Sequence, residues 1–394
     1  MSLNQIAADR PAVGSAIRSP LEFPDSPLAM ALKQPMMMGL FLPTQAGGWS
    51  ASTLPRTTDW TFDYNLALTK RAEELGYDLV FSLAQWLPKG GNGGVLNGTQ
   101  IEPMITTAAL SAVTSRILLV ATIHILYGPW HPLHIAKFGA TLDHITKGRW
   151  GINIVTGHRA VEHAMFGWQR IEHDLRYDMA AEFMDVVNEL WSNPENFSYE
   201  GKKWRMEGAF INPKPRFGRP ILVSATGSDK GIDFASRYSD IIFITSPAGA
   251  EIENALGALP AHVARVKAEA AQHGRNIRTL INPMVVCRET DAEAQEYYDA
   301  IASHVDPAAP KGMLTFDSDA QGWKGRLERD GYSRMAVGGN IQLVGSPEKI
   351  VHNMVRLKKA GVDGIQMNFF DFKPDLEFFG ERVIPLMKQA GLRL

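Results

Sequence analysis

The chain has 394 residues, of which 45% are hydrophobic and 21% are charged, a composition typical of globular proteins and unlike that of disordered or fibrous ones. Its 40 basic and 42 acidic residues give a formal net charge of -2, which excludes a global field that would attract nucleic acid or an anionic membrane. We therefore expect a small-molecule partner, with no nucleic acid and no membrane.

The sequence shows no targeting or membrane-spanning pattern. It contains no run of about twenty apolar residues, and its N-terminus lacks the basic, apolar and small-residue order of a secretory signal. A cytoplasmic location is expected. The single cysteine, Cys287, lies in an apolar run at 283–287 and has no intrachain disulfide partner, so we expect a buried core thiol.

The first 34 residues carry scattered prolines and no sustained hydrophobic period. They predict an irregular N-terminal arm (1–34) that wraps a surface or a partner subunit. Residues 35–394 are predicted to form one domain, because a single repeating order of strand, loop and helix runs through them.

Apolar runs of strand length alternate with helical spacing in chain order. The predicted strands are 36–42, 79–82, 117–121, 150–154, 221–223, 241–244, 280–286 and 364–369. The predicted helices are 64–75, 104–115, 132–145, 179–191, 230–237, 252–273, 292–304 and 347–360. A hairpin at 197–206 lies outside this alternation and is interpreted as an insertion.

Eight strand–helix units favour a (β/α)8 TIM barrel within the α/β class, with a doubly wound sheet as the second choice. In such a barrel the reaction site lies at the C-terminal ends of the strands. The stretch 306–339 is rich in Gly, Asp and Pro and precedes the last helix–strand pair. We interpret it as a candidate lid at that end of the barrel.

A possible phosphate site follows the fifth predicted strand. The segment SATGS at 224–228 leads into a helix, whose N-terminal amides would face the barrel mouth. An ordinary loop in which Ser228 caps the helix explains the pattern equally well. The glycine pairs at 47–48 and within 90–94 match neither a P-loop nor a dinucleotide fingerprint.

The segment NIVTGH at 153–158 places an amide and a hydroxyl after the fourth strand, where they suit a flat heterocycle. Asn153 and His158 are the candidate catalytic residues. Glu162 and His163 follow, with a solvated helix start as the alternative. Six histidines raise the question of a metal site, but the sequence has no HExxH motif or carboxylate at ligand spacing, so no metal is expected; they lie at 124, 131, 134, 158, 163 and 173.

Several motifs together resemble the dimethyl sulfone and pyrimidine monooxygenases, a branch of the bacterial luciferase-like flavin-dependent superfamily. The resemblance covers residues 36 to 388 in order. It is carried by RTTDW at 56–60, GPWHP at 128–132, TLDHITKGR at 141–149, NIVTG at 153–157, EHDLRY at 172–177 and FGERVIPL at 379–386. It implies a TIM barrel with luciferase-like insertions that uses O2 on a small organic substrate with reduced FMN (FMNH2).

Carried over position by position, the resemblance implies that FMN contacts lie at Ala84, Gln85, Asn153, Glu162, Arg176, Tyr177 and Ser228. Arg176, Tyr177 and Ser228 would hold the phosphate, and Asn153 would hydrogen-bond the isoalloxazine edge. The resemblance also implies an NAD(P)H-dependent flavin reductase as partner and a homodimer or homotetramer.

The sequence departs from the sulfone enzymes after Gly157, where His158 and Arg159 replace the usual Trp, and in the segment 123–127, which matches them poorly. A sulfone-type substrate is the first expectation. Oxidative cleavage of a nitrogen heterocycle, such as a pyrimidine or riboflavin, is the alternative. A non-redox barrel hydrolase or lyase, and a flavin- or deazaflavin-binding protein without oxygenation, are further readings.

Overall fold

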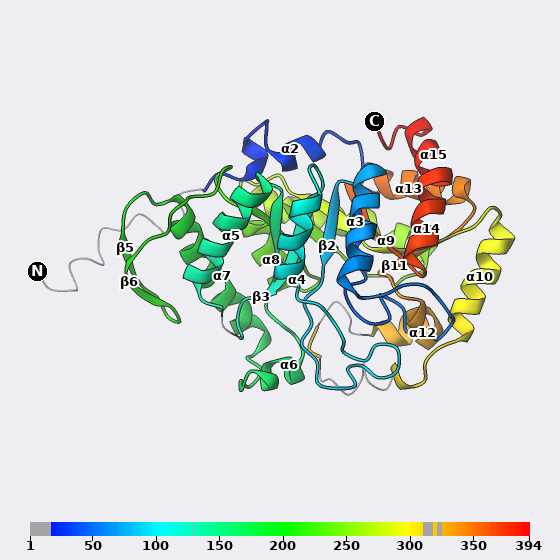
Figure 1. Cartoon of the computed structure of the whole chain (residues 1–394), viewed down its shortest axis with the longest axis horizontal. Coiled ribbons are helices and arrows are strands. Elements are labelled where there is room, and N and C mark those ends of the chain that lie inside the picture. Colours follow the sequence, from blue (N-terminus) through cyan, green and yellow to red (C-terminus); the bar gives the residue numbers. More distant parts are fainter. Residues whose placement is uncertain (1–16, 129, 310–317, 321–324) are drawn as a thin grey trace, which may run out of the picture.

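Eight parallel strands close into a barrel in the computed structural model, which describes residues 17–128, 130–309, 318–320 and 325–394. The order of the barrel strands is β1-β2-β3-β4-β7-β8-β9-β12, and β12 pairs back onto β1, so these eight strands form a closed barrel. Helices surround it (Figure 1). This confirms the predicted TIM barrel.

The barrel strands are β1 Met37–Phe41, β2 Leu79–Ser82, β3 Leu118–His124, β4 Trp150–Val155, β7 Ile221–Ala225, β8 Ile241–Ile244, β9 Arg278–Ile281 and β12 Gly364–Phe369. Outside it lie the hairpin β5 Phe197–Glu200 with β6 Arg205–Ala209, and β10 Pro283–Cys287 with β11 Ile341–Gly345. The helices are α2 Pro27–Ala31, α3 Phe62–Glu74, α4 Pro103–Leu110, α5 Pro132–Thr146, α6 Ala160–Met165, α7 His173–Ser192, α8 Asp229–Tyr238, α9 Ile252–Gln272, α10 Asp291–Ser303, α12 Arg326–Val337, α13 Pro347–Lys359, α14 Phe372–Phe378 and α15 Ile384–Gln389.

Successive side chains along each strand point alternately into the barrel interior and toward the surrounding helices, as in other barrels. Side chains of one parity, including Met37, Leu79 and Val120, form the barrel interior, while their neighbours pack between barrel and helices. In a TIM barrel the strand register shifts by one residue from each strand to the next, so alternate strands contribute side chains to one layer. The registers here place Phe81, Asn153, Phe243 and Gln366 in one interior layer near the mouth. The rings of Phe81 and Phe243 touch, with centroids 5.1 Å apart.

The N-terminal residues differ from the predicted irregular arm. Within 17–34 the chain forms a 3-10 turn at Pro20–Glu22 and then α2, each preceded by a capping serine. Leu28 is fully buried against the barrel interior, and Ser19 Oγ donates a 2.6 Å hydrogen bond to Asp240. This segment therefore closes the N-terminal end of the barrel. Residues 1–16 of the predicted arm lie outside the described residues.

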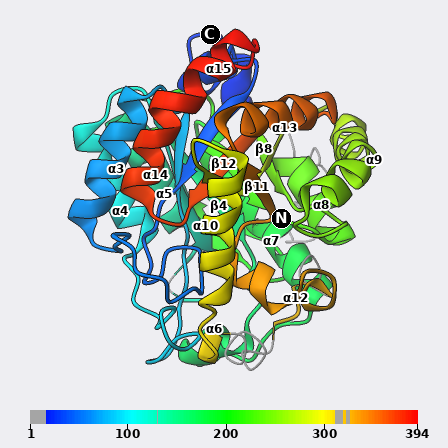
Figure 2. The same cartoon turned by 90° about the vertical axis from the view of Figure 1, so that its right-hand side faces the viewer.

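The opposite end of the molecule carries α6 and α12, while α2 and α15 lie at the N-terminal end (Figure 1). A perpendicular view shows the same separation (Figure 2). Part of the predicted lid is the helix α12, and another part, 310–317 and 321–324, lies outside the described residues. The lid role stays a prediction.

The seventh predicted strand, 280–286, is divided at Asn282 into β9 and β10. β9 stays in the barrel, whereas β10 pairs with both β12 and β11, a strand that the sequence analysis missed. Cys287 at the end of β10 is a buried free thiol, as predicted, and burial raises its pKa to about 12. Among the described helices, none combines the length and apolarity needed to cross a bilayer.

Candidate active site

The C-terminal ends of β3 and β4 form one wall of the barrel mouth. Asn153 on β4 is 1% exposed, and its Nδ2 donates a 3.0 Å hydrogen bond to Thr122 Oγ1 on β3. Within the described part of the chain, Asn153 Oδ1 is buried without a partner. A buried acceptor without a donor costs about 1–3 kcal/mol, so this oxygen is suited to a ligand or a water molecule.

The predicted phosphate site is assembled at the start of α8. Ser228 is the N-cap residue, and its hydroxyl accepts a 3.1 Å hydrogen bond from the Gly231 amide. A Cβ atom added at Gly231 would lie 1.9 Å from Thr226 Oγ1 and 2.7 Å from the Tyr177 hydroxyl. The hydroxyl groups of Tyr177, Thr226 and Ser228 therefore gather around Gly231 at the helix N-terminus, where Thr226 occupies the space that a Cβ atom would need. The capping interpretation of Ser228 is confirmed. Hydroxyl groups at a helix N-terminus suit an anion, and the phosphate interpretation stays a prediction.

Arg176 has a different neighbour from the one expected. Its guanidinium group is 1% exposed and forms hydrogen bonds of 2.9 and 2.8 Å to the two carboxylate oxygens of Asp319. Arg170 lies 3.5 Å from the same carboxylate. A carboxylate thus sits where the resemblance implies a phosphate, although Arg176 Nε remains buried without a partner among the described residues.

Glu162 is the centre of a buried polar cluster on α6. Tyr127 donates a 2.9 Å hydrogen bond to its Oε2, while the Trp86 amide, at 3.2 Å, and Arg159, at 3.3 Å, donate to its Oε1. Burial raises the pKa of Glu162, but His124 and Arg159 lower it further, so the pKa lies below its usual value. Glu162 therefore carries a negative charge, unlike the solvated helix start considered from sequence.

The loop after β2 joins this cluster. Arg159 also donates a 3.2 Å hydrogen bond to Gln85 Oε1, and the preceding Ala84 is buried. The structure therefore brings Ala84, Gln85 and Glu162 to the same side of the mouth as Asn153.

His158 is half-buried, and its Nδ1 lies 2.7 Å from Ser318 Oγ. Burial and the nearby Arg159 lower the pKa of His158 to about 3, so its ring is neutral near pH 7. Its backbone oxygen accepts a hydrogen bond of 3.2 Å from the Asp319 amide. His158 thus contacts the described part of the predicted lid, and its catalytic role stays a prediction.

Three contacts in the site were not predicted from the sequence: Thr122 with Asn153, Tyr127 with Glu162, and Asp319 with Arg176. Tyr127 and Glu162 are 35 positions apart and Arg176 and Asp319 are 143 apart, so no local spacing signals either pair. The poor family match at 123–127 was the one available signal, since Tyr127 lies in that segment.

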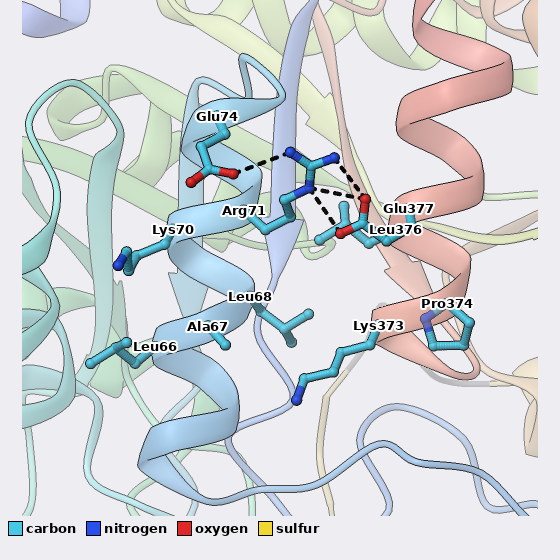
Figure 3. Close-up of a pocket in the computed structure, with 10 residues that line it drawn as sticks. All are labelled: Leu66, Ala67, Leu68, Lys70, Arg71, Glu74, Lys373, Pro374, Leu376 and Glu377. Atoms are coloured by element: carbon cyan, nitrogen blue, oxygen red, sulfur yellow. Dashed lines mark hydrogen bonds and ion pairs between the residues drawn. The ribbon is translucent and has the colours of Figure 1, made fainter.

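Two other features lie apart from the mouth. A groove of about 590 Å³ between α3 and α14 holds the ion pairs of Arg71 with Glu74 and Glu377, and no predicted site residue lines it (Figure 3). Asp233 on α8 comes together with Glu269 on α9 and with His273, the residue that follows α9. That cluster uses none of the six histidines considered from sequence.

Comparison with known proteins identifies the family. The chain is 32% identical over 368 residues to an FMNH2-dependent dimethylsulfone monooxygenase of Pseudomonas fluorescens (strain Pf0-1), covering 91% of this chain and 96% of that protein. It is 30% identical over 371 residues to a pyrimidine monooxygenase of Allorhizobium ampelinum (strain ATCC BAA-846 / DSM 112012 / S4), covering 91% and 97%.

A solved structure of a riboflavin lyase with modified FMN and riboflavin superposes with a TM-score of 0.79 at 25% identity, covering 92% of this chain and 93% of that one. A long-chain alkane monooxygenase shares the fold, with a TM-score of 0.76 at 21% identity, covering 92% and 93%. Residues 36–364 match the luciferase-like monooxygenase family. The expected superfamily and enzyme class are therefore confirmed, and this chain belongs to the luciferase-like monooxygenase family.

Proposed function

We propose that the chain is the oxygenase component of a two-component system, which takes FMNH2 from an NAD(P)H-dependent flavin reductase and uses O2 on a small organic substrate. The observation that carries the proposal is the anion cradle of Tyr177, Thr226 and Ser228 at the N-terminus of α8, beside a wall with an unpartnered Asn153 carbonyl. The names of the relatives supply FMNH2 as the cofactor that fits both features.

The chemistry of these residues supports FMN as the ligand. The cradle offers hydroxyl groups and helix amides to a phosphate, while Asn153 offers an acceptor to a ring N–H. The Thr226 hydroxyl has no hydrogen-bond partner among the described residues, so it is free to donate. Arg176 would join the phosphate contacts either by binding the phosphate together with Asp319 or by releasing Asp319 for the phosphate.

In the mechanism, bound reduced flavin supplies the electrons that activate O2. The chain's own residues bind the phosphate, orient the ring and keep water away from it. Asn153 is held by Thr122, so its carbonyl oxygen is fixed before the ligand arrives. Neutral His158 and the charged Glu162 flank the mouth, and His158 is our candidate for holding or moving a proton at its ring nitrogens.

We propose a sulfone-type substrate first, because the dimethylsulfone monooxygenase of Pseudomonas fluorescens is 32% identical over nearly the full chain. A nitrogen heterocycle is the second candidate. It is favoured by the similarity to the pyrimidine monooxygenase and to the riboflavin lyase. We also propose a cytoplasmic location and a homodimer or homotetramer. Light scattering of the purified protein would test the oligomeric state.

The function is tested by an assay that combines the protein with FMN, NADH and a generic flavin reductase. Dimethyl sulfone, uracil and riboflavin are supplied in turn, and products are measured by mass under ¹⁸O2. One of the three is expected to yield a product that carries ¹⁸O only when both FMN and reductase are present. Product that forms without FMN would contradict the proposal.

A further inference from the structure

His124 lies at the C-terminal end of β3, on the strand face that points into the barrel. Every second residue of β3 points into the barrel: Leu118 and Val120 are part of the barrel interior, and Thr122 accepts the hydrogen bond from Asn153. His124 is therefore the next interior side chain above Thr122, toward the mouth. It is 6% exposed, and its Nδ1 is buried with no hydrogen-bond partner among the described residues.

The imidazole ring of His124 is held by stacking on one of its faces. It stacks on the Tyr127 ring, with centroids 5.0 Å apart and an interplanar angle of 21°. Tyr127 is itself fixed by its 2.9 Å hydrogen bond to Glu162 and by Gly157, where a Cβ atom would lie 2.3 Å from Tyr127 Cε1. Such packing restricts the ring to one orientation, as in a binding site prepared before the ligand arrives.

Glu162 also determines which nitrogen of His124 carries the proton. The carboxylate Oε2 lies 3.8 Å from His124 Nε2, and Glu162 is 1% exposed. A neutral imidazole has one N–H, and the nearby negative charge favours that N–H on Nε2. Nδ1 is then an acceptor.

Two acceptors without donors thus lie on one wall: Asn153 Oδ1 and His124 Nδ1. A sulfone offers only acceptor oxygens and satisfies neither of them. A ring with N–H groups satisfies them. Both reduced flavin and a substrate with a ring amide carry such groups.

We propose that His124 is a ligand-binding residue whose Nδ1 accepts a hydrogen bond from an N–H donor of the ring bound at the barrel mouth. This inference rests on the proposed function and extends it, because it assigns the β3–β4 wall to an N–H-bearing ring and places a sulfone elsewhere in the mouth. The N–H belongs either to the reduced flavin or to a ring-amide substrate, and the experiment separates these two sources.

The test compares three substitutions that keep different parts of the imidazole. Asparagine places an acceptor near Nδ1, glutamine places one near Nε2, and phenylalanine keeps only the ring that stacks on Tyr127. The variants are His124→Asn, His124→Gln and His124→Phe. His134→Asn on the exposed face of α5 is the matched control. Circular dichroism and thermal melting of each ligand-free variant establish that the fold is intact.

The dissociation constant of FMNH2 is measured without oxygen, and KM is measured for uracil and for dimethyl sulfone. If the flavin is the donor, His124→Gln and His124→Phe weaken FMNH2 binding about tenfold, while His124→Asn and the control do not. If the substrate is the donor, FMNH2 binding is unchanged and KM rises for uracil but not for dimethyl sulfone.

Equal effects of all three His124 substitutions, or no effect on either ligand, would overturn the proposal. Those results would show that the ring acts through packing alone. If the wild-type protein binds no flavin in either redox state, the proposed function itself fails, and the inference about His124 fails with it.

Discussion

Arg176 on α7 holds Asp319, 143 positions later in the chain, through two hydrogen bonds of 2.9 and 2.8 Å. The guanidinium is buried beside the described part of the predicted lid, where Asp319 also binds the backbone of His158. A carboxylate and a phosphate are both anions that pair with arginine through two oxygens. Asp319 is therefore a direct competitor for the phosphate role that we propose for Arg176.

Substituting Arg176→Ala is expected to weaken FMN binding by about 1.5–3 kcal/mol, the range for a hydrogen bond to a charged group. Riboflavin lacks the phosphate, so its affinity should hardly change. Asp319→Asn removes the competitor and should tighten FMN binding. Isothermal titration of both ligands measures the effect. Equal losses for FMN and riboflavin would show that Arg176 only anchors the loop.

Gly231→Ala tests the anion cradle. The added methyl group would lie 1.9 Å from Thr226 Oγ1, so the Thr226 hydroxyl would have to move out of the cradle. FMN affinity should fall by at least tenfold, while riboflavin affinity falls less, as fluorescence titration would report. Gly257→Ala on the exposed face of α9 is the control, because no atom lies within 4 Å of its added Cβ; it should stabilise the helix by up to about 1 kcal/mol. An unaffected FMN affinity in Gly231→Ala would remove the phosphate from this site.

Asn153→Ala should uncouple oxygen consumption from product formation. The substitution removes the carbonyl that we assign to the ring edge, so more hydrogen peroxide and less product should form for each NADH oxidised. Thr122→Val is the companion variant, since it removes the hydroxyl that holds Asn153 and should uncouple less. Peroxide and product yields are measured together with the melting temperature. Unchanged coupling with a large loss of stability would assign Asn153 a structural role.

The stability of the protein should fall as the pH falls below about 6.5. Burial lowers the pKa of His124 to about 4, so the native ring stays neutral while the unfolded ring takes up a proton. Its share is about 2 kcal/mol between pH 7 and pH 5. Burial raises the pKa of Asp375 to about 6, which acts in the opposite direction in every variant.

Urea unfolding at pH 7 and pH 5 measures the contribution of His124 to the free energy of unfolding. The difference between the two pH values should be about 2 kcal/mol smaller in His124→Phe than in the wild type. The same pH dependence in both proteins would mean that His124 is protonated in the native state.

The barrel was predictable because each strand is a short apolar run bounded by turn residues, a local pattern. The division of 280–286 at Asn282 was not, because the change of partner from β8 to β11 depends on pairing between distant strands. The closure of the barrel by Leu28 was not predictable for another reason. Leu28 lies in α2, which has five residues and begins at Pro27, too little sequence to show a helical period.

In the site, too, local features could be predicted from the sequence and contacts between distant residues could not. Ser228 and Asn153 could be proposed from the sequence because Asn153 lies near the C-terminal end of a strand and Ser228 in the loop after one, where barrel residues reach the mouth. The partners of Arg176 and Glu162 were not found, because Asp319 and Tyr127 reach them only through the fold. The resemblance that suggested Arg176 as a phosphate contact could not predict its ion pair with Asp319.

The central claim, that this chain takes reduced FMN as a diffusing substrate, is tested most directly by anaerobic equilibrium titration of the purified protein. We expect protein that is isolated largely colourless, binds one FMNH2 per chain and binds it more tightly than oxidised FMN, with both affinities reduced by Gly231→Ala. Protein that is isolated yellow, with stoichiometric oxidised FAD bound tightly, would contradict the account.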